Sequence, residues 1–148
     1  LATAVALILS GTGVVGASVG NSQAWIVADE VTVLTENQHR KPMMGSGDAR
    51  PVGFSHRPFE GWLLVGTDGL FNYASRPKIS RACDGTGARQ VAAALVDAAR
   101  LADGGLQDDI AVAALRPSPP TGSSARLDSA PRAGRRRRGH AAIRAGPP

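Results

Sequence analysis

The sequence contains a single cysteine, Cys83, among its 148 residues. One cysteine excludes an internal disulfide, and it fits a reducing compartment such as the cytoplasm. Charge is missing from residues 1–28, an absence that would suit a signal peptide or a membrane helix. The stretch has no basic start, however, and Gly, Ser, Thr and Asn interrupt it repeatedly, so we expect buried strands there and no membrane segment.

The charge of the chain is concentrated in its C-terminal part. The formal net charge is +5, yet residues 117–148 hold seven arginines against one acid, which is +6 and leaves −1 for residues 1–116. The composition after Pro117 shows no hydrophobic periodicity. We therefore predict one domain over 1–116 and a disordered Pro/Arg-rich tail over 117–148. Because the chain starts at Leu1 without a methionine, we also expect parts missing upstream.

The hydropathy pattern predicts a mixture of strands and one clear helix. Residues 88–101 place Val91, Leu95, Ala98 and Leu101 at helical spacing, before a glycine stop at Gly104-Gly105. A short helical turn is expected after Asp68, ended by Arg76-Pro77. Residues 36–58 are polar and rich in Gly and Pro, which predicts a long loop. Short apolar runs predict strands at 1–9, 14–20, 22–28, 31–35, 61–69 and 108–117.

Three glycines near the start, Gly11, Gly13 and Gly16, match the G-x-G-x-x-G spacing of dinucleotide-binding loops. Such a loop needs a helix opening at its second glycine to receive the pyrophosphate. The following residues, VVGASVGNSQAWIV, show no helical stripe. A strand–turn–strand hairpin is the better interpretation, and dinucleotide binding is the last of the alternatives.

Two aspartates stand at predicted strand ends. Asp68 closes the apolar strand GWLLVGTDG, and Asp108 comes immediately before the apolar part of the strand 108–117. Carboxylates at strand ends that share a cleft suit hard divalent cations such as Mg²⁺ or Mn²⁺, which take oxygen ligands. The alternative is a simple turn at Asp68-Gly69 and a solvated Asp108. The histidines His39, His56 and His140 lack ligand spacing, and neither Cys83 nor Ser46 has a partner for nucleophilic catalysis.

The order of four segments resembles the protein phosphatase 2C (PPM-type) family, in a bacterial branch, over residues 1–116. The segments are LATAVALILSGTGVVGASVGNSQAWIV, VTVLTENQ, LLVGTDGLFNY and LQDDIAVAAL. In that family a "T-D-G-L/I-W/F" motif precedes a terminal "D-N/D-I/V-T/A-V" strand. The T-D-G-L-F and D-D-I-A-V pair, in this order and between predicted strands, is the most specific part of the match.

The resemblance implies an α+β fold, an αββα sandwich of two antiparallel sheets flanked by helices and here truncated at its N-terminus. It implies a metal-dependent protein serine/threonine phosphatase, in which a metal-bridged water attacks the phosphorus of phosphoserine or phosphothreonine in a phosphoprotein. The cofactor would be a two-metal Mn²⁺ or Mg²⁺ centre. By motif match Asp68 and Asp108 would be metal ligands. Asp109 stands where asparagine is common, so it and Gly69 are expected beside the ligands and not on the metal.

The sequence departs from the family at several positions. The family's N-terminal acidic ligand, its D-G-H-G segment and its phosphate-binding arginine have no counterpart here. Asn21 and Asn72 stand where acids help to hold an additional metal, and a neutral amide lacks the negative charge that a hard cation favours. We therefore expect little phosphatase activity from this chain alone, and a phosphatase-like domain that binds partners without catalysis is the alternative.

The arginine run GRRRRGH at 134–140 raises binding to nucleic acid or to an anionic surface. The tail contains no aromatic residue to stack on bases, and solvated arginine runs are common in such tails. We expect no specific nucleic-acid partner and no membrane partner. The pattern does not indicate an oligomeric state.

Overall fold

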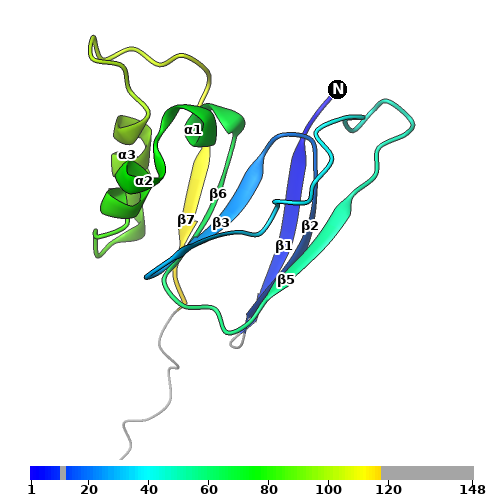
Figure 1. Cartoon of the computed structure of the whole chain (residues 1–148), viewed down its shortest axis with the longest axis horizontal. Coiled ribbons are helices and arrows are strands. Elements are labelled where there is room, and N and C mark those ends of the chain that lie inside the picture. The colour runs from blue at the N-terminus through cyan, green and yellow to red at the C-terminus, as the bar shows by residue number, and fades with distance from the viewer. Residues whose placement is uncertain (11–12, 118–148) are drawn as a thin grey trace, which may run out of the picture.

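The computed structural model describes residues 1–10 and 13–117, and in them two antiparallel β-sheets lie face to face with helices on one side (Figure 1). The first sheet has the order β1-β2-β5 and the second has the order β4-β3-β6-β7. The strands are β1 (Ala4–Ser10), β2 (Gly13–Val19), β3 (Gln23–Val27), β4 (Val31–Val33), β5 (Val52–His56), β6 (Trp62–Gly66) and β7 (Val112–Leu115).

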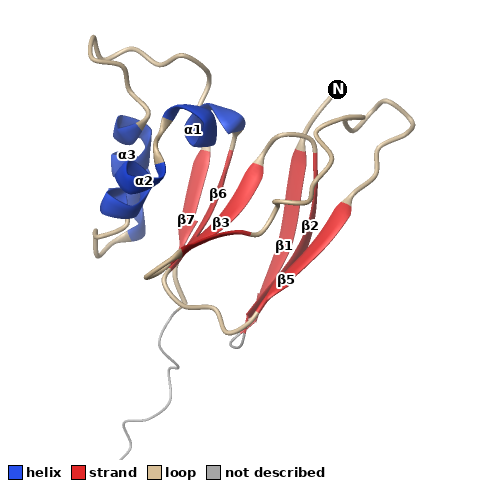
Figure 2. Ribbon diagram, viewed as in Figure 1, coloured by secondary structure: helices blue, strands red, loops and turns tan. Residues whose placement is uncertain are grey.

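Three helices follow β6 in the chain and cover the outer face of the second sheet (Figure 2). They are α1 (Asp68–Tyr73), α2 (Arg76–Ala82) and α3 (Ala88–Ala98). No helix within the described residues covers the outer face of the first sheet. Ile8 and Val15 pair on that face and are 71% and 49% exposed.

Side chains along β3 and β6 point alternately to the two faces of the second sheet, and they contribute to the core on both faces. Trp25 and Leu64 face the helices, and they belong to a cluster that includes Leu70, Phe71, Ile79, Val91 and Leu95. Ile26 and Leu63 face the other way and pack with Val14 of the first sheet. Because successive side chains of a strand point to opposite faces, these two central strands hold sheet to sheet and sheet to helix at once. This is the α+β sandwich expected from the sequence.

The glycine-rich start folds as the hairpin that the sequence predicts. Strands β1 and β2 pair antiparallel from Ala4↔Val19 to Ser10↔Gly13. Gly16 lies inside β2, where a side chain would collide with the carbonyl of Ala6 and the ring of Phe54. This glycine therefore serves close strand packing, and no helix opens in the described residues between β2 and β3.

The predicted loop 36–58 is wrong over Val52–His56, which form β5 and pair with β2. In β5 every second side chain is half-buried, namely Val52, Phe54 and His56. The neighbouring Pro and Gly residues made this alternation hard to recognise in the sequence. The remaining loop is tied down by two contacts. Gly20 donates its N–H to the carbonyl of His39, and Ala2 pairs with Met44.

The helical region also differs from the prediction. Arg76-Pro77 does not end the helical structure but opens α2, because proline in a first turn lacks only an N–H that would have no partner. Helix α3 ends at Ala98, so Ala99 is buried in place of Leu101, which is 41% exposed. The last strand is β7, shorter than the 108–117 that was predicted.

No helix of the described part is both long and apolar enough to cross a membrane. His39 is exposed and His56 is half-buried. The expected tail lies, from residue 118 onward, outside the described residues, and His140 and the arginine run lie there with it.

Candidate metal centre

Asp68 is the first residue of α1, two positions beyond the end of β6. The sequence placed it at the tip of a longer strand, but the strand stops at Gly66 and Thr67 is the N-cap residue of the helix. The Asp68 side chain is half-buried at this strand-to-helix junction. It therefore lies where a carboxylate remains accessible to solvent or to a ligand.

Thr67 ties this junction to the segment that carries Asp108. Its hydroxyl donates to the carbonyl of Asp109 at 3.1 Å and accepts from the N–H of Ala111 at 3.1 Å. The backbone N–H of Thr67 also donates to the carbonyl of Ala111 at 3.0 Å. Three hydrogen bonds from one residue thus hold the segment before β7 against the start of α1.

Asp108 is exposed and lies four residues before β7, not immediately before it as the sequence suggested. Its Oδ1 accepts the N–H of Asp109 at 2.8 Å, which fixes the side chain to its own loop. Gly69, next to Asp68, is buried against this loop, and a Cβ there would lie 3.3 Å from the Cβ of Asp108. The two predicted carboxylates therefore belong to segments in direct contact.

Asn21, in the turn between β2 and β3, reaches the same place. Its Nδ2 donates to Oδ2 of Asp68 at 2.7 Å. The sequence identified Asn21 as a lost metal ligand, and the structure shows what the amide does here: it holds one oxygen of Asp68. Sequence reasoning missed this contact and the role of Thr67, although both residues stand inside the motifs that were identified.

The oxygen ligands at this site are of the type that a hard divalent cation binds, but they are too few. Asp68 and Asp108 provide carboxylate oxygens, and Oδ1 of Asp68 makes no hydrogen bond within the described part of the chain. Mg²⁺ and Mn²⁺ need more oxygen ligands than two carboxylates supply. Among residues 1–10 and 13–117 no group of three or more His, Cys, Asp or Glu side chains could hold a metal.

The neighbouring residues leave the centre open on one side. Asn72 is exposed on α1, and Asp109 is exposed with its carbonyl bound to Thr67. A pocket of about 340 Å³ runs beside Thr67 between β1 and the β6–β7 pair, and aliphatic residues form most of its wall. A polypeptide or ligand in this pocket would lie next to the centre.

The solved structures that superpose on this chain include bacterial phosphatases. An arginine-substituted form of a bacterial serine phosphatase superposes with a TM-score of 0.66 at 26% identity, over 77% of this chain and 53% of that one. The serine/threonine phosphatase Stp1 from Staphylococcus aureus gives 0.62 at 20% identity, over 77% and 55%. The catalytic domain of the serine/threonine phosphatase PstP, solved with two manganese ions, gives 0.61 at 19% identity, over 76% and 56%.

These matches confirm the fold-level resemblance to phosphatases of the protein phosphatase 2C type. The chain spans little more than half the length of these structures. No family model and no curated protein sequence matches the chain.

Proposed function

We propose that this chain is the C-terminal part of a metal-dependent protein serine/threonine phosphatase domain, with residues 1–116 as the domain portion. The substrate would be phosphoserine or phosphothreonine in a protein. One observation carries the proposal. In a fold shared with solved serine/threonine phosphatases, Thr67 joins the segments of Asp68 and Asp108, so that two carboxylates lie at one end of the sandwich.

The roles of the residues follow from their chemistry. Asp68 and Asp108 would each offer a carboxylate oxygen to Mn²⁺ or Mg²⁺, cations that activate a water and neutralise charge on phosphoryl oxygens. Thr67 and Gly69 keep the two segments at contact distance, and Asn21 orients Asp68. Asp109 turns its backbone to Thr67 and would stay off the metal.

A binding-only, phosphatase-like domain is the second candidate. Asn21 favours it, because an amide at this position adds no negative charge to the centre. The small number of ligands within the described residues favours it as well. In this case the fold would contact a partner protein without hydrolysing a phosphate ester.

Calorimetric titration of the chain with Mn²⁺ separates these two functions. The enzymatic proposal expects weak binding that is lost in both Asp68→Ala and Asp108→Ala, while Asp103→Ala, an exposed acid in the turn after α3, binds as the parent does. Absence of binding in the parent chain, or binding that survives both substitutions, would contradict the metal centre.

Activity is tested with p-nitrophenyl phosphate and a phosphothreonine peptide in Mn²⁺. The chain alone should show little turnover, because its ligand set is incomplete. Robust turnover that disappears in Asp68→Ala would show that the described carboxylates suffice, contrary to our expectation.

A further inference from the structure

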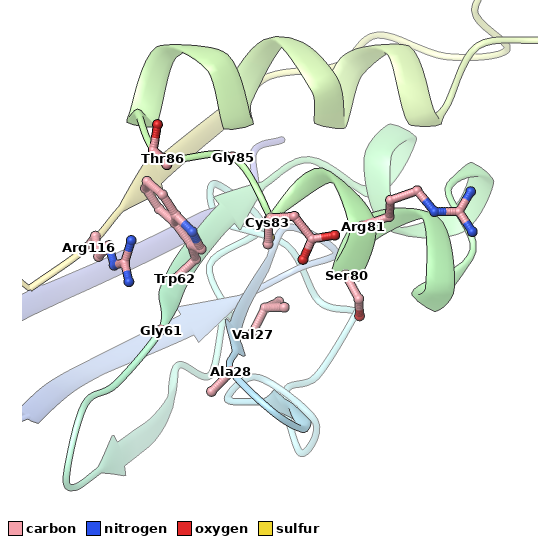
Figure 3. Close-up of a pocket in the computed structure, with 11 residues that line it drawn as sticks. Val27, Ala28, Gly61, Trp62, Ser80, Arg81, Cys83, Gly85, Thr86 and Arg116 are labelled. Carbon is pink, nitrogen blue, oxygen red and sulfur yellow. The ribbon is translucent and has the colours of Figure 1, made fainter.

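A second pocket, of about 460 Å³, lies at the opposite end of the second sheet from the Asp68 centre (Figure 3). It forms where β3 ends at Val27 and β6 begins at Trp62, under the loop that joins α2 to α3. Gly61 lines it with a φ of +76°, and a side chain there would collide with the carbonyl of Val27. The backbone thus turns tightly at the mouth of this pocket.

Two arginines line the pocket, and neither has an acidic partner among the residues that the structure describes. Within the described ranges Arg100–Asp97 is the single salt bridge, so Arg81 and Arg116 make none. Asp84 is the only acid in the lining, which gives the pocket a net charge of +1 from two cations and one anion. A concave site with surplus positive charge attracts anions.

Arg116 is the better placed of the two. Its guanidinium carbon lies 5.6 Å from the centroid of the Trp62 ring, and Figure 3 shows the side chain beside that ring. Trp62 is only 5% exposed, so its packed ring gives the exposed Arg116 a surface to stack on, and this contact favours guanidinium positions beside the pocket. Arg81 extends away from Trp62 in Figure 3 and adds positive charge at the rim.

The loop between α2 and α3 leads into the N-terminus of α3 beside the pocket. Thr86 lines the pocket and immediately precedes Gly87, the N-cap of α3, and in Figure 3 its hydroxyl points toward the start of this helix. Gly87 provides no side-chain cap, and the first turn of the eleven-residue helix contains no acid. The positive end of the helix dipole is therefore not neutralised locally. The start of α3 therefore adds to the positive potential on this side of the pocket.

We infer that this pocket binds a small ligand through an oxyanion group, with Arg116 as the contact that holds it and Arg81 as a second positive charge at the rim. The planar fork of an arginine suits both phosphate and carboxylate. The site is independent of the phosphatase proposal, because it shares no residue with the Asp68 centre. The pocket would bind an anionic metabolite at a distance of about the length of β6 from the expected metal ligands.

The indole N–H signals of Trp62 and Trp25 provide the measurement, because the chain contains only two tryptophans. The ¹⁵N-labelled full chain is titrated with inorganic phosphate in the presence of EDTA, which removes divalent cations from the Asp68 centre. We expect a saturable shift of the Trp62 signal with a Kd on the order of a millimolar. Trp25, whose indole donates to Gln23, should not shift.

Substitutions of opposite sign test the charge argument. Arg116→Gln should weaken the phosphate titration about tenfold, since it removes a charge-assisted hydrogen bond. Asp84→Asn should strengthen it roughly twofold to fivefold, because it removes the only negative charge in the lining. Arg50→Gln, an exposed arginine in the loop before β5 that does not line the pocket, is the matched control and should not change it.

A parallel titration with acetate distinguishes the two sources of the oxyanion. Saturation by both anions supports a general oxyanion site, and saturation by phosphate alone supports a phosphate ester as the ligand. Sodium chloride at equal ionic strength should leave the Trp62 signal in place. A phosphate response that is absent, that sodium chloride reproduces, or that Arg116→Gln leaves unchanged overturns the inference.

Discussion

The side-chain amide of Asn21 donates a 2.7 Å hydrogen bond to Oδ2 of Asp68, across 47 positions of sequence. This contact joins the turn after β2 to the start of α1, and therefore connects the two sheets at the end where Asp108 also lies. An amide can orient a carboxylate, but it cannot share a cation with it as a second carboxylate would. The charge at position 21 should thus decide how strongly this end of the fold responds to a metal.

We predict that Asn21→Asp makes the stability of the chain depend on Mn²⁺. Without metal, the new carboxylate lies beside that of Asp68 and repels it, and a loss of about 1 kcal/mol would lower the Tm by about 4 °C. With Mn²⁺ the same pair gains a bridging cation, and the Tm should rise above that of the metal-free variant. Thermal unfolding followed by circular dichroism measures both values.

Asn21→Ala is the control for this substitution. It removes the hydrogen bond without adding charge, so its Tm should fall in the absence of metal and should not recover with Mn²⁺. Equal responses to Mn²⁺ in the Asp and Ala variants would contradict the assignment of Asp68 to the metal centre.

Thr67→Val tests the tie between the two carboxylate segments. Valine has the same shape but leaves the carbonyl of Asp109 and the N–H of Ala111 without their hydroxyl partner. Because these groups are partly solvated, we expect a loss of about 1–2 kcal/mol in the free energy of unfolding by urea. Mn²⁺ affinity should fall about 10–100-fold, as it does when a residue that supports metal ligands is removed.

The isosteric control is Thr32→Val on β4, an exposed position whose hydroxyl has no hydrogen bond in the described residues. It should change unfolding by less than about 0.5 kcal/mol. If both threonine variants lose the same stability, the loss at position 67 cannot be assigned to the tie.

Gly69→Ala should push apart the segments that carry Asp68 and Asp108. An added methyl group would collide with the backbone carbonyl of Asp109, which cannot rotate away as a flexible side chain could. The cost expected for such overpacking is about 1–3 kcal/mol of unfolding free energy, with a parallel loss of Mn²⁺ binding. Gly53→Ala is the matched control, since its nearest atom would lie at 3.8 Å, an ordinary contact distance.

Local pattern was sufficient for most strands and for the main helix. β-branched runs between turn residues predicted β1, β2, β3, β4 and β6, and helical spacing predicted α3. It was insufficient for β5, because Val52–His56 become a strand through pairing with β2, far away in the sequence. It was also insufficient for α2, where Pro77 looked like a stop although proline is favourable in a first turn.

The site shows the same division. The positions of Asp68 and Asp108 beside strands predicted that their segments would meet, and the contact through Thr67 and Gly69 brings them together. Whether these side chains bind a cation stays a prediction. The hydrogen bond from Asn21 could not be predicted, because it depends on how two sheets are placed and not on any local spacing.

Cys83 offers a test that is independent of metals. It follows α2 and is half-buried beside Asp84, and burial, followed by the Asp84 charge, raises the pKa of its thiol from 9.0 to about 11. Only the thiolate reacts, so modification by a disulfide reagent should be slow in the folded chain at pH 8. In urea the rate at this pH should be about a hundredfold higher, which is the ratio of thiolate expected from pKa values of about 11 and 9.0.

The same shift sets a sign for stability. The pKa of Cys83 is higher in the folded chain than in the unfolded chain, so the folded chain holds the thiol proton more tightly. The resulting contribution to the free energy of unfolding is complete below pH 9.0 and is lost as the pH rises toward about 11. Asp84→Asn removes the smaller cause and should move the reaction profile to lower pH by a fraction of the whole shift. Asp103→Asn, away from the thiol, should leave the profile in place. Coinciding profiles for the folded and urea-unfolded chain would show that this end of α2 opens to solvent far more readily than its packing indicates.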